Sequence, residues 1–187
     1  MTLIDLLAPT YLQMLNALSA WLQKAEQQLP PEQTQALLIS RLAPDMFPLA
    51  TQVRFACVQA LEGVHRLHGM AFPPLHAAML EEGRNAAERP GSVSDAIARI
   101  EETIAAVAAL SEKSGSGQSA PIAHDLPNGM VFDLTAEQYS RDWALGQFYF
   151  HLMIAYAILR NQGIALGKAD YVAHMFAHIR PGTIPAG

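Results

Sequence analysis

The stretch from Tyr149 to Arg160 carries side chains that can bind a ligand or transfer a proton. Tyr149, Tyr156 and Arg160 follow one another at intervals of seven and four residues, so a helix would align them on one stripe. His151 falls on a neighbouring face among apolar residues, where a buried imidazole needs a hydrogen-bonding partner. An imidazole, two phenols and a guanidinium on one helix can recognise an anionic or polar group.

A second polar edge is expected earlier in the chain, where Asp45 and Gln52 lie seven residues apart beside an apolar stripe. If the two edges meet inside a helical domain, they enclose a pocket in which His151 acts as an acid, a base or a ligand. The same residues can instead form a satisfied hydrogen-bond network that only holds the helices in register. Both interpretations stay open at the level of sequence.

Other histidines have spacings that a metal ion can use. His65 and His68 are three residues apart with His76 in the following loop, and His174 and His178 are four apart near the end of the chain. Nothing near the first group supplies an obvious carboxylate or thiolate partner, and the second group lies in a tail that is expected to fray. We therefore favour solvated histidines at both places.

Composition narrows the classes of function. The 187 residues carry a net charge of −5 without a run of Lys or Arg, which argues against nucleic acid and anionic membranes as partners. No signal peptide or membrane-spanning run is recognisable, so we expect a cytoplasmic protein. The single cysteine, Cys57, lies among apolar residues and is expected to be buried. Nucleophile-elbow and Gly-rich phosphate-binding motifs are missing from the sequence.

Apolar residues recur every three or four positions in four long segments, which predicts helices over 2–29, 45–68, 92–110 and 135–162. Pro30 and Gly69 are expected to end the first and second helices. Asp45 is expected to cap the second helix, and capping boxes should begin the third and last, from Ser92 and from Thr135. Shorter helices are expected near 33–40 and within 70–91.

Two short alternating segments flank Asn128 and Gly129, a pair typical of hairpin turns. In the last helix we expect an inward face that includes Tyr139, Trp143 and Phe150. The predicted fold is all-α: one domain over residues 1–187 built as an antiparallel four-helix bundle, with a small β-hairpin before the last long helix. Residues 171–187 are expected to form a flexible tail, and the segment from Leu166 to Gly187 can add one short helix before the Pro- and Gly-containing end.

The segments LAPDMFPLATQV and FYFHLMIAYAILRNQGIALGKADY resemble the signature segments of a bacterial family of unknown function, DUF1993, in the DinB/YfiT-like superfamily. The segment YLQMLNALSAWLQKAE and the hairpin support the resemblance, which extends to about Tyr171. It implies a four-helix bundle and a homodimer.

Members of that superfamily often bind a divalent metal through three histidines, and some are thiol transferases. By position, His151 resembles the first histidine of the pair on the last helix, Ala155 stands at the second, and Gln52 stands where the second helix would supply its histidine. One imidazole and one amide are a poor site for zinc or nickel, so no metal cofactor is predicted.

The sequence thus predicts a homodimeric protein that binds a small molecule between the second and last long helices. The candidate ligand-binding residues are His151, Tyr149, Tyr156, Arg160, Asp45 and Gln52. One alternative is a divalent-metal-dependent thiol transferase or hydrolase of the DinB type that recruits histidines from elsewhere. Another is a non-catalytic protein that acts through dimerisation alone.

Overall fold

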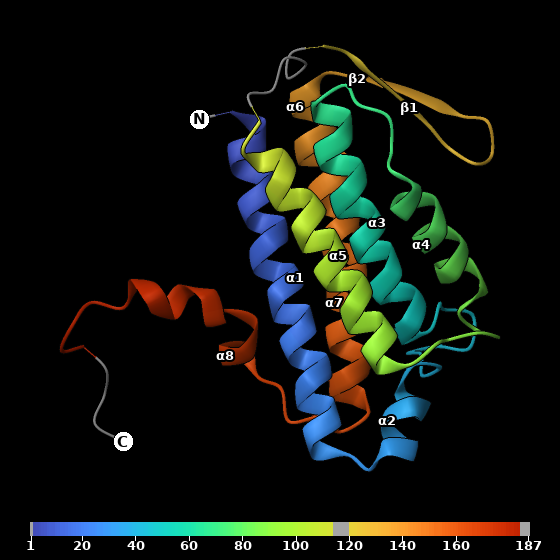
Figure 1. The fold of residues 1–187 in the computed structure, drawn as a ribbon, viewed down its shortest axis with the longest axis vertical. Coiled ribbons are helices and arrows are strands. Elements are labelled where there is room, and N and C mark those ends of the chain that lie inside the picture. Colours follow the sequence, from blue (N-terminus) through green and yellow to red (C-terminus); the bar gives the residue numbers. More distant parts are fainter. Residues whose placement is uncertain (1, 114–119, 184–187) are drawn as a thin grey trace.

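The computed structural model describes residues 2–113 and 120–183, and most of them are helical. One antiparallel sheet of two strands, β1 and β2, precedes the last long helix (Figure 1). Both features agree with the prediction. The elements in chain order are α1 Leu3–Gln28, α2 Pro31–Leu37, α3 Leu49–Leu67, α4 Pro74–Asn85, α5 Val93–Ser111, β1 Ile122–Asp125, β2 Val131–Leu134, α6 Ala136–Gln138, η1 Tyr139–Ala144, α7 Leu145–Asn161, α8 Lys168–Tyr171 and η2 Ala173–His178.

The long helices α1, α3, α5 and α7 pack side by side along most of their lengths. In Figure 1, α1 and α7 run in one direction and α3 and α5 run in the other. Helix α3 contacts the other three and also carries α4 on its outer side. It is therefore the element around which the molecule is organised.

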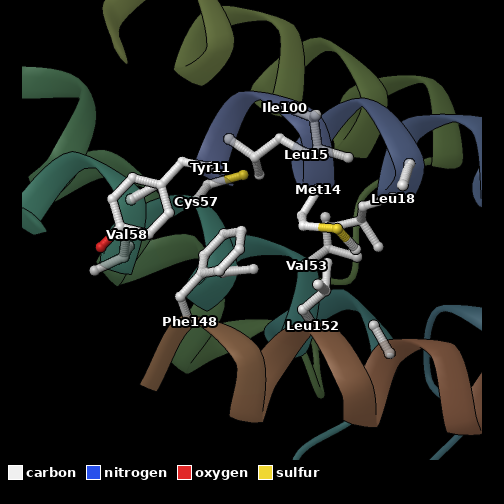
Figure 2. Packing of buried hydrophobic residues seen from close by; sticks show 14 of the residues in the cluster. Tyr11, Met14, Leu15, Leu18, Val53, Cys57, Val58, Ile100, Phe148 and Leu152 are labelled. Carbon is white, nitrogen blue, oxygen red and sulfur yellow. The ribbon is translucent and has the colours of Figure 1, made fainter. Parts of the chain in front are cut away.

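The core lies where these helices meet, and Figure 2 shows its centre. The ring of Phe148 on α7 packs edge-on against Tyr11 on α1, with ring centres 4.7 Å apart. Cys57 is buried as predicted, and burial raises the pKa of its thiol to about 12. The cysteine is therefore a small apolar side chain of the core and not a nucleophile.

Side-chain caps begin the helices α1, α5 and α6. The predicted capping boxes are confirmed: the Ser92 and Thr135 side chains accept hydrogen bonds from the backbone amides of Asp95 and Gln138. The prediction for Asp45 is wrong, because α3 begins only at Leu49 and Asp45 is exposed in the preceding turn. Pro48 disfavours helix in the residue before it, which delays the start of α3.

The helix that precedes and includes α7 contains a π-helical turn, η1, over Tyr139–Ala144. Such a turn holds an extra residue and rotates everything that follows relative to an α-helical period. Tyr139 is buried as predicted, but Phe150 is 56% exposed, and the inward face of α7 runs instead through Phe148 and Leu152. A constant helical period predicts Phe150 on the inward face, and the π turn breaks that period.

The predicted hairpin is confirmed, with Ile122 paired to Leu134 and Asp125 to Val131. Gly129 adopts a φ of +86° in the connecting turn, a conformation that favours glycine. Along β1, Ile122 and His124 are buried, and the residues that follow each of them are exposed. The hairpin thus directs His124 toward the helices.

Within the described ranges, no helix is both long and apolar enough to cross a membrane. Two short helical elements follow α7: α8 over Lys168–Tyr171 and η2 over Ala173–His178. An ion pair of 2.8 Å between Lys24 and Asp170 joins α8 to α1. Residues 1, 114–119 and 184–187, the last of which belong to the predicted tail, lie outside the described residues.

Candidate functional site: a cavity on the outer face of α3

A cavity of about 540 Å³ lies between α3, α4, the hairpin and the start of the last long helix. Its lining combines aromatic and aliphatic side chains with several titratable ones. Going from element to element, it consists of Phe47; Phe55, Val58, Gln59, Glu62 and Arg66 of α3; Phe72; His76, Leu80 and Arg84 of α4; His124, Asp125, Leu126 and Pro127 of the hairpin; Trp143 of η1; and His151 of α7.

One face of α3 supplies the floor of the cavity. Phe55, Gln59, Glu62 and Arg66 follow at spacings of four, three and four residues, which places them on one stripe. Helix α4 lies close to this stripe at Gly83, whose carbonyl accepts a hydrogen bond of 2.8 Å from the Thr51 hydroxyl. A Cβ at position 83 would stand 2.5 Å from the Phe55 ring, so glycine allows the approach that closes one side of the cavity.

A largely buried histidine–carboxylate contact joins α3 to α4 inside the cavity wall. Nε2 of His76 lies 2.8 Å from Oε1 of Glu62, and both side chains are largely buried. The Phe72 ring stacks on the His76 ring with centres 4.4 Å apart, and the Arg66 guanidinium lies 5.1 Å from the centre of the same Phe72 ring. Arg66 also donates hydrogen bonds to the Ala123 carbonyl and to the Asp125 carboxylate, which fastens the hairpin over the cavity.

The hairpin end of the cavity contains buried polar atoms without a protein partner. Both ring nitrogens of His124, Nε1 of Trp143 and Oε1 of Gln59 make no hydrogen bond within the described part of the chain. The His124 and Trp143 rings lie 4.4 Å apart. Burial lowers the pKa of His124, and the nearby Arg66 guanidinium lowers it further. His124 is therefore a neutral imidazole at physiological pH.

At the opposite end, the Gln52 side chain joins His151 to the backbone. Nδ1 of His151 lies 2.9 Å from Oε1 of Gln52, whose amide nitrogen donates to the Phe47 carbonyl at 3.1 Å. The Phe55 ring meets the His151 ring edge-on at 5.3 Å. Burial lowers the pKa of His151 to about 4, so this imidazole is also neutral.

The residues around His151 do not fit the three-histidine metal site that the superfamily resemblance implies. Gln52 supplies a weak amide oxygen that is already bonded to His151, and Ala155 has no ligand atom. Across 2–113 and 120–183, no group of three or more His, Cys, Asp or Glu side chains is arranged to hold a metal ion. We therefore derive no chemistry through a metal at this place.

Of the six candidate residues from sequence, the structure brings only Gln52 and His151 together. Tyr149 and Tyr156 are half-buried against the core, with Tyr156 packed edge-on against Trp21 at 5.1 Å. Arg160 donates to the Leu166 carbonyl, and Asp45 is exposed. None of these four lines the cavity.

The prediction that His65, His68 and His76 are solvated is wrong, because all three are buried. His65 donates from Nδ1 to the Leu61 carbonyl at 2.8 Å, and burial lowers its pKa. His174 and His178 lie in a 3₁₀ turn, where residues four apart do not share a face.

Sequence reasoning missed Glu62, Arg66, His76, His124 and Trp143 as cavity residues. The regular spacing of Phe55, Gln59, Glu62 and Arg66 along α3 was a signal that could have found the floor. His124 and Trp143 reach the cavity through the hairpin and the π turn, which the local pattern does not place in space.

The mostly helical fold, with a hairpin before its last long helix, is that of a DinB-like domain. In particular, the chain belongs to the DUF1993 family, a domain of unknown function, whose family model matches residues 3–172. A similar solved structure is the crystal structure of a DinB family member protein from Shewanella denitrificans. It is 30% identical, the match covers 98% of this chain and 96% of that chain, and the TM-score is 0.71. The search of curated proteins finds no match.

Proposed function

We propose that this protein binds a small, largely apolar molecule in the cavity beside α3. A volume of about 540 Å³ falls within the range of about 300–1,000 Å³ that ligand pockets usually occupy. Aromatic side chains with a few polar groups are the usual composition of such pockets, and Phe47, Phe55, Phe72 and Trp143 supply the aromatic part here.

The observation that carries this proposal is the set of unpartnered polar atoms on His124, Trp143 and Gln59. A buried donor or acceptor without a partner costs about 1–3 kcal/mol of stability. A ligand that hydrogen-bonds to these atoms relieves this cost while its apolar part leaves water. The proposed site therefore shares α3 and α7 with the pocket predicted from sequence, but it extends toward α4 and the hairpin.

The scaffold in this proposal is an antiparallel four-helix bundle of α1, α3, α5 and α7. We further propose that the protein is a cytoplasmic homodimer. The side chains of Phe150 and Met153 on α7, 56% and 39% exposed, support a contact between copies. Light scattering coupled to gel filtration tests this point: a monomer at micromolar concentration contradicts it.

Competition between ligand and side chain tests the proposed cavity. Compounds from a library of small aromatic molecules that raise the Tm of the wild-type protein should fail to raise that of Leu80→Trp, because the larger ring fills the cavity. Leu42→Trp is the matched control, since Leu42 is exposed and does not line the cavity. Equal shifts in both variants, or no shift by any compound in the wild-type protein, would contradict the proposal.

A further inference from the structure

The orientation of the Gln52 amide is determined by its two neighbours. Its nitrogen donates to the Phe47 carbonyl at 3.1 Å, and its oxygen lies 2.9 Å from Nδ1 of His151. The reversed amide would place its oxygen against the Phe47 carbonyl oxygen, so two acceptors would face each other. Oε1 of Gln52 therefore faces His151.

This orientation decides which nitrogen of His151 carries the proton. An amide oxygen can only accept, so the hydrogen of the neutral imidazole must lie on Nδ1. Nε2 then presents a lone pair. It makes no hydrogen bond in the described part of the chain, and His151 lines the cavity.

We infer that His151 and Gln52 form a fixed hydrogen-bond acceptor, and that the ligand of the cavity is an uncharged aromatic molecule whose N–H or O–H group donates to Nε2 of His151. This inference rests on the proposed function and adds the class of ligand. The Phe47 and Phe55 rings, with centres 5.6 Å apart, line the cavity beside His151 and suit a flat aromatic ligand.

The same geometry discriminates against anions at this end of the cavity. A carboxylate or phosphate oxygen placed at Nε2 would face a lone pair and lose its own hydration, which is unfavourable. Arg66 and the Glu62–His76 pair line the cavity as well, but Glu62 is bonded to His76, and Arg66 is engaged with Asp125. His151 is therefore a specificity-determining residue for a donor.

The first part of the test measures the tautomer directly. Long-range ¹H–¹⁵N NMR spectra of protein labelled at histidine nitrogens should show His151 with its proton on Nδ1. Gln52→Ala should abolish this preference because the acceptor is removed. Gln59→Ala is the matched control, since Gln59 also lines the cavity but makes no bond to His151, and it should leave the His151 signals unchanged. A proton on Nε2 in the wild-type protein overturns the inference.

The second part uses 2-naphthol and 2-methoxynaphthalene, which share a ring system but differ in the O–H donor. We expect 2-naphthol to bind about tenfold more tightly and to shift the Nε2 resonance of His151, because one hydrogen bond is worth about 1.4 kcal/mol. In His151→Phe the two probes should bind equally. Equal affinity for the wild-type protein overturns the inference although the proposed function stands.

If neither probe binds, the result contradicts the proposed function and the ligand class together. The spectrum without a probe then still decides whether His151 is a fixed acceptor, so the two failures can be told apart.

Discussion

The two faces of α3 differ in composition and in packing. The core face, consisting of Val53, Cys57, Ala60, Leu61 and Val64, is fully buried and apolar and packs against the other long helices. The cavity face, consisting of Phe55, Val58, Gln59, Glu62 and Arg66, mixes aromatic, aliphatic, amide and charged side chains around open space.

The difference shows what each face contributes. On the core face, burial of apolar area stabilises the fold and every side chain has close neighbours. On the cavity face, polar groups are held in place although some of their atoms have no partner in the described part of the protein. Such groups are tolerated when they serve binding, so we expect the core face to determine stability and the cavity face to determine function.

The largest expected effect comes from the core face. Leu61→Ala should lower the free energy of unfolding by about 2–5 kcal/mol, because Leu61 is fully buried and its truncation leaves a void. Urea unfolding measures this loss. Leu42→Ala, at a position that is 42% exposed, should stay within about 0.5 kcal/mol of wild type, and a comparable loss there would contradict the comparison.

Lowering the pH should destabilise the protein through the buried imidazole of His151. His151 has an unperturbed pKa of 6.5, and burial lowers it to about 4, so the unfolded chain takes up a proton more readily. The contribution of His151 to the free energy of unfolding is therefore complete above pH 6.5. It is lost as the pH falls toward 4, by about 3 kcal/mol in total. Urea unfolding at several pH values measures it. His151→Leu should flatten this dependence, whereas His178→Leu, at an exposed position, should not.

The closeness of α4 to the cavity face can be tested at Gly83. Gly83→Ala should destabilise the protein by about 1–3 kcal/mol, because the new methyl group collides with the Phe55 ring. Gly146→Ala is the control on α7, where nothing lies within 4 Å of the added Cβ, and it should stabilise by about 0.5–1 kcal/mol. Thermal unfolding of both variants gives the sign of each effect; stabilisation by Gly83→Ala would show that α4 lies farther away.

The smallest expected effect distinguishes function from stability on the cavity face. Gln59→Leu should leave the free energy of unfolding unchanged or raise it by up to about 1 kcal/mol, because it removes a buried oxygen that has no partner in the described residues. Chemical denaturation is the measurement. A loss above 2 kcal/mol would show that Gln59 is a structural residue like those of the core face.

Much of the fold follows from local signals in the sequence. The apolar periods of α1, α3, α5 and α7, the capping boxes at Ser92 and Thr135, and the Asn128–Gly129 turn act within a few residues of the chain. The mostly helical architecture with its hairpin was therefore predictable, and the family match agrees with the resemblance.

The cavity was less predictable because its parts are distant in sequence. Helical spacing predicts that Tyr149, Tyr156 and Arg160 share one stripe. It does not predict the neighbours of this stripe, which are α1 and the segment after α7. The π turn further changes the direction of Phe150 and places Trp143 in the cavity wall. The two predicted polar edges meet only at the contact of Gln52 with His151, the two residues that the family resemblance also placed at one site.

The bond from Gln52 to the Phe47 carbonyl has a consequence for how the cavity can evolve. Every amino acid at position 47 keeps a main-chain carbonyl, so the imidazole of His151 can retain its proton arrangement while the Phe47 side chain is exchanged. Position 47 is thus free to change the shape of the cavity without reversing the polarity of its acceptor. If the proposed function holds, substitutions at position 47 would change the outline of the ligand that fits while leaving the hydrogen bond to His151 in place.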